Sequence, residues 1–395
     1  MKRVKFKDIE QPVKIKTKKF FKQNFFGSAP APFIGRYGYP NINIGILSPQ
    51  LITNNEAYSS PKLWSKENYK IHEIANLRYS LVNSRTKWHI KDLKRNKRFI
   101  EVVQEVGLAK TNAEVEVGLK KAPTLNLKSE KEIIPWGPAS QINKARITSN
   151  VKVNQKVEKL TSDTDLKANK AITQLYNKGL EEQQLTKLIS VGTLGIGKNR
   201  KMVPTRWSIT AVDDTIGKQL IKEVKDYNLG DYTAYFGGGW GNYYLLLFFP
   251  EVWSYELFET YLYSEKNPWS KKGLMYSTDF ENHNGRKSYA EETAGGYYAC
   301  RLSVIEKMKK LKKQHSCLAL RFITSEYNIP LGVWTCREAT RKSLQATPIT
   351  FASKALLLRY AQLLIKKKFG VEISQFISQS KLLKEQKQQK KMSDF

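Results

Sequence analysis

The longest apolar run in the sequence, residues 243–249, is only seven residues long. A helix needs about 20 apolar residues to cross a bilayer, so this run is too short for a membrane span and is typical of a buried strand. Hydrophobic residues make up 41% of the 395 and aromatic residues 11%, which predicts a globular fold with one large core or two smaller ones. Because no apolar stretch of about 7–15 residues follows the basic N-terminus, we expect no secretory signal.

The chain is strongly basic. Lysine and arginine total 67 against 36 acidic residues, which gives a net charge of +31. Such a charge repels itself unless it meets an anion, and the commonest large anion in a cell is nucleic acid. An AT-rich genome or a hot habitat would give a similar composition with a solvated surface instead. The three cysteines, Cys300, Cys317 and Cys336, lack the spacing of a zinc site or a disulfide framework, which suits a reducing cytoplasm. With the short apolar run, this leads us to expect a cytoplasmic protein without membrane contact.

Apolar periodicity predicts an α+β fold with a mixed, largely antiparallel sheet in the second half and flanking helices. Strands are predicted at residues 42–46, 99–106, 113–119, 207–212, 233–236, 243–249, 274–280, 297–302 and 318–323. Helices are predicted at residues 67–82, 166–190, 302–312 and 352–369. Residues 99–106 and 113–119 would form a hairpin.

Shifts in composition predict five regions along the chain. Residues 1–22 hold nine Lys or Arg and two acidic residues, which is typical of a mobile basic arm. Prolines and weak periodicity mark a polar stretch in the middle. The predicted regions are the arm 1–22, an N-terminal α+β region 23–120, a linker or surface excursion 121–165, the main α+β region 166–370, and a flexible tail 371–395.

The last seven residues predict a docking peptide. Gln389, Met392 and Phe395 follow a lysine-rich run at i, i+3 and i+6, so a 3₁₀ turn would place them on one face. An apolar pair then anchors the peptide in a pocket, and the amide fixes its register. The pattern resembles the box by which DNA-replication and repair proteins bind the sliding clamp (PCNA), with Met in place of the commoner Leu or Ile. A solvated, frayed tail is the alternative.

Three segments of the sequence resemble the archaeal Nre family of DNA-repair proteins. They are residues 27–40 with the following strand to residue 45, residues 203–215, and residues 238–244 with 253–258. The resemblance implies a role in archaeal DNA repair, at the nucleoid, with recruitment to the sliding clamp through a C-terminal box. That box maps onto Gln389, Met392 and Phe395. Family members often begin with a cysteine-rich, zinc-finger-like segment, and the lysine-rich arm stands in its place here.

Aromatic and cationic side chains alternate in the glycine-rich first loop, where Arg36 and Tyr37 are the preferred nucleic-acid contacts. Unstacked bases pack on such aromatic rings, each for about 1–3 kcal/mol. Residues 243–249 are also aromatic, but their apolar neighbours favour a core strand.

Other cations are predicted to contact the phosphate backbone. The loop at 192–199 matches the G-x-x-x-x-G-K pattern, but it has Asn199 where Ser or Thr would hold magnesium, and a helix is predicted before it. A phosphate-contacting loop is therefore favoured over nucleotide hydrolysis. Arg337 and Arg341 would share one helical face, or pair with Glu338 alone. The predicted contacts are Lys198, Arg200, Lys201, Arg206, Arg286, Arg337 and Arg341.

Asp213 and Asp214 end a predicted strand, where a nuclease would gather carboxylates around Mg²⁺ or Mn²⁺. At most one of the two would face such a site, and Glu251, Asp279, Glu291 or Glu292 would have to complete it. The favoured alternative is a cap on a helix beginning at residue 215.

Three functions thus stay open from the sequence. The first is a DNA-binding repair protein recruited to the clamp. The second is a metal-dependent nuclease acting on branched or single-stranded DNA. The third is an RNA-binding factor whose C-terminal pattern is accidental.

Overall fold

The computed structural model describes residues 1–9, 20–93, 97–124, 132–265, 269–270 and 273–388. The chain divides into two units, and both mix helices with strands, which confirms the α+β class. No helix in these described ranges is long and apolar enough to span a membrane. We call the first the barrel unit (Val13–Ile216 and Ile329–Val333) and the second the sheet unit (Met1–Pro12, Gly217–Asn328 and Trp334–Phe395).

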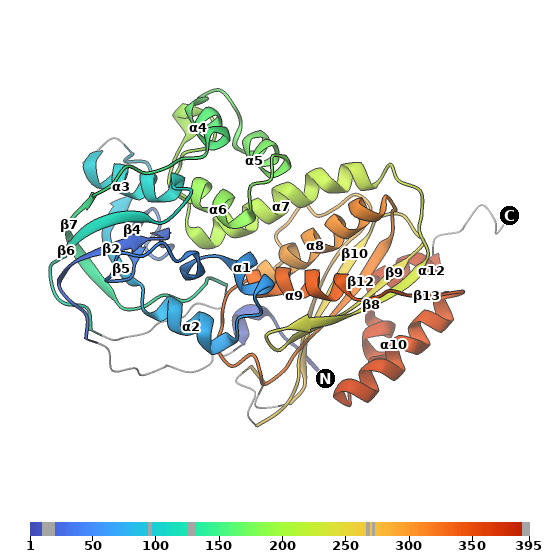
Figure 1. Cartoon of the computed structure of the whole chain (residues 1–395). Coiled ribbons are helices and arrows are strands. Elements are labelled where there is room, and N and C mark those ends of the chain that lie inside the picture. Colours follow the sequence, from blue (N-terminus) through green and yellow to red (C-terminus); the bar gives the residue numbers. More distant parts are fainter. Residues whose placement is uncertain (10–19, 94–96, 125–131, 266–268, 271–272, 389–395) are drawn as a thin grey trace. The chain divides into compact units, whose positions relative to one another are not determined.

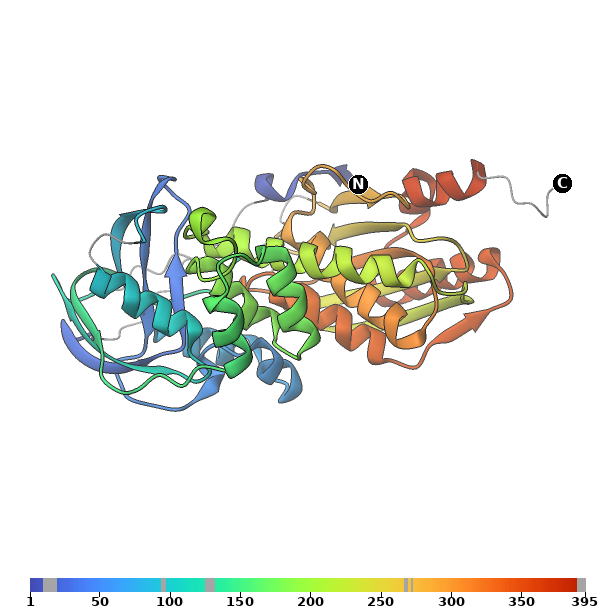
Figure 2. The same ribbon diagram turned by 90° about the horizontal axis from the view of Figure 1, so that it is seen from above.

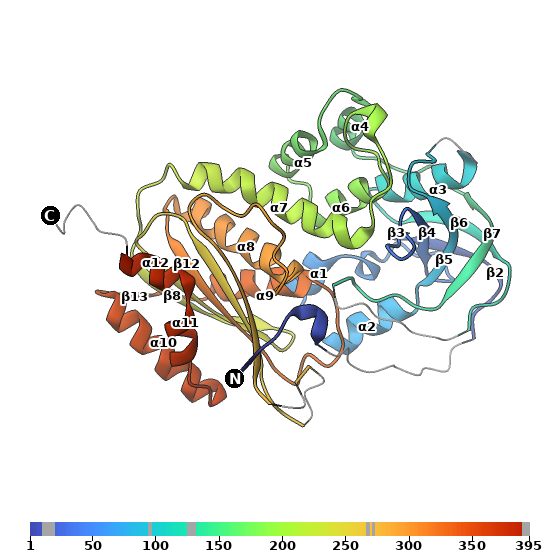
Figure 3. The same ribbon diagram turned by 180° about the vertical axis from the view of Figure 1, so that it is seen from behind.

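The barrel unit contains one curled sheet with the neighbour order β2-β6-β7-β5-β4-β3. β2 and β3 lie at opposite ends of this order, yet only Pro30 separates them in the chain. The two edges of the sheet are therefore halves of one bent strand, and the sheet closes into a barrel (Figure 3). Its strands are Asn24–Ala29 (β2), Ala31–Ile34 (β3), Asn41–Ser48 (β4), Val82–His89 (β5), Ala113–Leu119 (β6) and Ala139–Ile147 (β7).

The closure depends on a close approach between β2 and the end of β4. A Cβ added to Gly27 would lie 2.1 Å from the carbonyl oxygen of Pro49, so only glycine fits there. The N–H of Ser28 donates to the carbonyl of Leu51 (3.2 Å) and holds the same two segments together. Pro30 has no N–H for a ladder, which is why the strand bends at this position.

The barrel interior is apolar because inward positions alternate along each strand. Ile42, Ile44 and Ile46 of β4 are all fully buried in one core cluster, as the period-two pattern predicted. Val115 and Val117 of β6 join the same cluster, which confirms the strand predicted at 113–119. The alternate residues of these strands face outward.

The strand predicted at residues 99–106 is wrong, because this segment belongs to helix α3 (Lys97–Leu108). Its β-branched residues favoured a strand, but Ile100, Val103 and Val106 recur every three residues and pack together into the barrel core. α3 contacts β3, β4 and β7, so it fills an end of the barrel. Tertiary packing overrides the local β propensity here.

The remaining helices of the barrel unit differ in part from the prediction. The single helix expected at 166–190 is two helices, because the chain turns at Gly179 with φ of +89°. The stretch 121–165 carries β7 and a helix, and Trp136 within it is buried. These helices are Pro61–Lys66 (α1), Ile71–Tyr79 (α2), Gln155–Ser162 (α4), Ala168–Asn177 (α5) and Glu182–Ser190 (α6).

The strand predicted at 207–212 is also wrong, because helix α7 spans Thr205–Val224. Val212, Ile216 and Leu220 are buried at intervals of four residues, which is a helical period. Pro204 directly precedes the first turn, where its missing N–H costs nothing.

The sheet unit contains a seven-stranded sheet in the order β1-β11-β10-β12-β9-β8-β13. Two of its neighbouring pairs, β1 with β11 and β10 with β12, are parallel, and the other pairs are antiparallel. The prediction of a mixed, largely antiparallel sheet is confirmed. Its strands are Lys2–Arg3 (β1), Tyr232–Gly239 (β8), Asn242–Phe249 (β9), Tyr255–Tyr261 (β10), Met275–Glu281 (β11), Ser316–Ile323 (β12) and Ile349–Phe351 (β13).

Helices cover both faces of this sheet (Figure 1). α8 and α9 lie on one face, and α10 lies on the other. The strand predicted at 297–302 is wrong, because this segment belongs to the first turns of α8, where all of its residues are buried. The helices are Gly295–Leu311 (α8), Trp334–Gln345 (α9), Lys354–Phe369 (α10), Ser374–Gln379 (α11) and Lys381–Gln388 (α12).

Both termini of the sheet unit are held by specific contacts up to the limits of the described residues. The start of the arm, predicted to be mobile, pairs as β1 with β11, and the dark blue segment lies beside the gold strand in Figure 2. Arg3 forms two hydrogen bonds of 2.9 Å with Glu292. Much of the predicted tail is also packed, since Phe376 and Leu382 are buried. Gln389, Met392 and Phe395 lie outside the described residues.

We predict that Gly27→Ala destabilises the barrel by about 1–3 kcal/mol, because the added methyl group forces β2 away from β4. A matched control is Gly118→Ala on β6, where the new Cβ would meet side-chain atoms of Asn24 and Lys144 at 3.2 and 3.3 Å. Thermal unfolding measures both. Equal melting temperatures for the two variants would contradict the closure described here.

Candidate nucleic-acid interface

The loop that joins β3 to β4 carries the preferred contacts, Arg36 and Tyr37. Backbone hydrogen bonds hold both of its ends, from the N–H of Gly35 to the carbonyl of Asn43 (2.7 Å) and from the N–H of Asn41 to that of Gly38 (2.8 Å). The side chain of Tyr37 is 66% exposed. The guanidinium of Arg36 lies 4.7 Å from the centre of its ring, and donates to its hydroxyl (3.0 Å). The loop thus presents a cation and an aromatic face as one surface feature.

The first turn of α7 extends this surface. Trp207 is 42% exposed, and its ring centre lies 5.1 Å from that of Tyr39, which is 44% exposed. The N–H of Ile34 donates to the hydroxyl of Thr205 (3.2 Å), so α7 and the loop are fastened together. Exposed aromatic rings are costly in water, and a fixed pair of them is suited to stacking with a planar ligand. We call Arg36, Tyr37, Tyr39 and Trp207 the aromatic patch.

The cations of the loop after α6 divide into two kinds. Lys198 and Lys201 are exposed, as a phosphate contact requires. Arg200 instead donates to the carbonyl oxygens of Gly195 and Thr161, both at 2.8 Å, and burial lowers its pKa. Arg206 forms an ion pair with Glu132, which is buried. The observed contacts of Arg200 and Arg206 hold the loop, and their role in binding nucleic acid stays a prediction.

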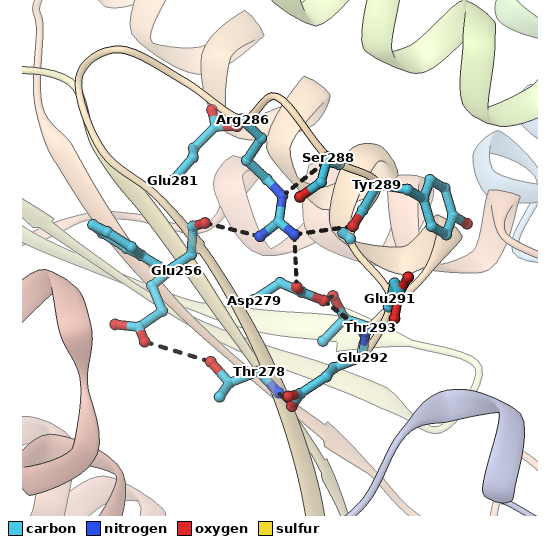
Figure 4. Close-up of polar contacts among 12 residues, drawn as sticks. Glu256, Thr278, Asp279, Glu281, Arg286, Ser288, Tyr289, Glu291, Glu292 and Thr293 are labelled. Carbon is cyan, nitrogen blue, oxygen red and sulfur yellow. Dashed lines mark hydrogen bonds and ion pairs between the residues drawn. The ribbon is translucent and has the colours of Figure 1, made fainter.

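Arg286 lies in the sheet unit and organises the segment 282–293 (Figure 4). Its Nη1 donates to the carbonyl of Phe280 (2.8 Å), and its Nη2 lies 3.0 Å from Oδ1 of Asp279. The other oxygen of Asp279 accepts from the N–H (2.8 Å) and the hydroxyl (2.9 Å) of Thr293. Arg286 and Asp279 therefore fasten this segment to the end of β11, which gives the arginine a structural role.

Arg337 and Arg341 both lie on α9, at the predicted i, i+4 spacing. Arg341 bonds Glu306 through Nε (2.9 Å) and Nη2 (2.7 Å), and Glu338 through Nη1 (2.7 Å). Arg337 is buried, with 6% of its surface exposed. The pairing of Arg341 with Glu338 agrees with the alternative weighed for it, and Glu306 on α8 was not expected. These contacts do not support the predicted phosphate contact of Arg337 and Arg341, which stays a prediction.

The two aspartates proposed for metal binding lie inside α7 rather than at a strand end or a helix cap. Asp213 is fully buried and Asp214 is half-buried. Their supposed partners Glu251, Asp279, Glu291 and Glu292 belong to the sheet unit. Among the residues that the structure describes, no group of three or more His, Cys, Asp or Glu is positioned to hold a metal ion.

Family models match nearly the whole sequence. Residues 5–270 match archaeal Nre, N-terminal, and residues 281–395 match archaeal Nre, C-terminal. The chain belongs to the archaeal Nre family. No solved structure matches it.

Curated members of the Nre family include similar proteins from two archaea. DNA repair protein NreB of Archaeoglobus fulgidus is 33% identical over 363 residues, which cover 91% of this chain and 89% of the relative. DNA repair protein NreA of Haloferax volcanii is 34% identical, over 81% of this chain and 77% of the relative. NreA of Archaeoglobus fulgidus is 34% identical, over 82% and 81%.

Several exposed or half-buried residues of this Nre chain were missed in the sequence. Trp207 was assigned to a strand, which hid its place beside the first loop. Arg85 and Lys87 of β5 were not considered, although they alternate with Thr86 and Trp88. That alternation is the pattern of a strand with a cationic outer face, and it could have found them.

We predict that Arg286→Ala lowers stability, by up to about 3–5 kcal/mol, because it leaves the buried carboxylate of Asp279 without its cation. Lys198→Ala removes an exposed cation from the barrel unit and changes stability by less than about 0.5 kcal/mol. Thermal unfolding of both variants tests the division into structural and exposed cations. An unchanged melting temperature for Arg286→Ala would contradict it.

Proposed function

We propose that this Nre protein acts in DNA repair by binding DNA through the barrel unit while its C-terminal box holds it on the sliding clamp (PCNA). Three curated relatives that are 33–34% identical are named DNA repair proteins. The observation that carries the DNA-binding part is the aromatic patch, with Lys198 and Lys201 exposed in the same unit. Such surfaces suit a ligand that offers both phosphates and bases.

The net charge of +31 supports an anionic partner of this kind. Because four of the predicted arginines are engaged by acidic groups or backbone carbonyls, the exposed lysines and the patch are left to supply most phosphate contacts. Contacts of this kind release counterions, so the binding is expected to be sensitive to salt.

The C-terminal box follows directly after an anchored helix. Glu256 of β10 accepts hydrogen bonds from the N–H groups of Lys381 (3.1 Å) and Leu382 (3.0 Å) at the start of α12. Leu382 and Leu383 are buried against the sheet unit. A helix held in this way anchors the start of the proposed box to the sheet unit. Tethering two weak sites raises overall affinity by about 10²–10⁴ without new contacts.

We predict that affinity for DNA falls about 10³-fold or more between about 50 and 200 mM salt, provided that about six or more phosphates are contacted. Fluorescence anisotropy with a labelled oligonucleotide, at several salt concentrations, gives the slope. A flat response to salt would contradict phosphate binding. An equal affinity for structured RNA would favour an RNA-binding factor instead.

We predict that Gln389→Ala combined with Phe395→Ala abolishes capture by the clamp and leaves DNA affinity nearly unchanged, because the proposed DNA contacts belong to the barrel unit and the box to the sequence after α12. The matched control is Gln388→Ala, an exposed glutamine at the end of α12 and one residue before the box. Pull-down with the purified clamp measures both variants. Capture that survives in the double variant would contradict the assignment of the box.

A further inference from the structure

The strand order of the barrel unit matches a known nucleic-acid-binding barrel. With β2 and β3 counted as one bent strand, the chain runs β2/β3, β4, β5, helix α3, β6 and β7. The neighbour order is then first-second-third-fifth-fourth-first, and the third and fifth strands, β5 and β7, are parallel. This is the topology of the OB fold, a small barrel that binds oligonucleotides or oligosaccharides.

The OB topology points to one face and one loop of the barrel. Ligands of such barrels bind over the second and third strands, with the loops that join the first strand to the second and the fourth to the fifth. In this chain those strands are β4 and β5, and the first of those loops is 35–40, which carries Arg36, Tyr37 and Tyr39. The composition of loop 35–40 and the topology of the barrel therefore point, independently of each other, to the same loop as a binding site.

The outer face of β4 and β5 is cationic at the end next to loop 35–40, whereas Leu47 and Asn83 at its other end are buried. Because Ile42 and Ile44 point into the core, their neighbours Asn41 and Asn43 point outward. Asn43 pairs with Lys87, which is exposed, and Arg85 lies two residues before it on the same face. Partial burial lowers the pKa of Arg85, so a nearby anion would stabilise its charge. Within the described parts of the chain, no acidic side chain forms an ion pair with Arg85 or Lys87.

The opposite wall of the barrel is different. On β6 and β7 the outward cations Lys144 and Arg146 both form ion pairs with Glu116, at 3.1 Å for Lys144. Phe26 of β2, 53% exposed, lies across from Glu116 in the same row. This wall therefore has an exposed aromatic ring and cations like the other, but its cations are neutralised internally. Among the described residues, Arg85 and Lys87 of the β4–β5 face differ from Lys144 and Arg146 in having no acidic partner.

We propose that the barrel unit is an OB-type domain that binds single-stranded DNA across the β4–β5 face, with bases stacked on the aromatic patch. This inference rests on the proposed DNA-binding function and specifies its substrate. Arg85 and Lys87 contact the phosphates, while Tyr37 and the Tyr39–Trp207 pair receive the bases. Stacking on exposed rings needs bases that are not stacked in a duplex, which selects single strands. The cations Arg85 and Lys87 favour a nucleic acid over an oligosaccharide, because the nucleic acid carries charged phosphates.

The test compares two matched double variants of the full chain. Tyr37→Ala with Lys87→Ala removes an exposed aromatic ring and an exposed lysine from the proposed face. Phe26→Ala with Lys144→Ala removes the same two chemical groups from the opposite wall. Affinity for an oligo(dT) of about 16 nucleotides, the upper site size of one OB barrel, is measured by anisotropy. A duplex and an oligo(rU) of equal length are measured beside it.

We expect the first double variant to bind oligo(dT) roughly 5- to 150-fold more weakly, and the second to bind like the unchanged protein. Tyr37→Phe keeps the ring and should keep the affinity, which separates stacking from misfolding. Equal losses in both double variants, or none in either, overturn the proposal. Tighter binding of the duplex or of oligo(rU) than of oligo(dT) overturns it too.

These outcomes are distinguishable from failure of the proposed function. If the unchanged protein binds neither single-stranded nor duplex DNA, then DNA binding itself is wrong. If it binds duplex DNA tightly and the β4–β5 variants have no effect, DNA binding stands and the OB assignment of the site is wrong.

Discussion

The approach of β2 to β4 at Gly27 is the constraint on which the barrel unit depends. It allows one strand, bent at Pro30, to supply both edges of the sheet. Once the sheet is closed, successive residues of a strand point alternately into the barrel core and outward. The outward row of β4 and β5 and the loop before β4 then share one side of the barrel. Closure of the barrel therefore positions the loop and the strands of the candidate interface, and α7 adds Trp207.

The chain has a net charge of +31, yet arginines in its core are paired with carboxylates. Inside the sheet unit, arginines meet carboxylates, as in the buried pairs Arg301–Glu281 and Arg321–Glu259. On the barrel, Glu116 pairs with Lys144 and Arg146 of one wall, whereas no acidic side chain among the described residues pairs with Arg85 or Lys87 of the β4–β5 face. Arg85 and Lys87 thus lie where an anionic ligand could pair with them. A large net charge alone would not have distinguished these two walls.

Much of the fold could be predicted from local periodicity, and much of the site could not. Residues 42–46 and 243–249 form strands as predicted. In both segments the burial in the folded chain agrees with the strand pattern of the sequence. Residues 99–106 and 207–212 were misassigned because β-branched residues suggested strands, whereas burial follows a helical period in both. The contacts of Arg200 with Thr161 and of Arg341 with Glu306 could not be predicted, because these partners lie more than 30 residues away in the chain. Only the first loop carried enough aromatic and cationic residues to be recognised directly.

Hydrogen–deuterium exchange of the full chain, with and without a saturating oligo(dT), tests the central claim most directly. Binding across the β4–β5 face should protect the backbone amides of residues 35–43 and 85–91 and leave those of 114–118 and 140–146 unchanged. Protection confined to β6 and β7, or found only in the sheet unit, would contradict the account.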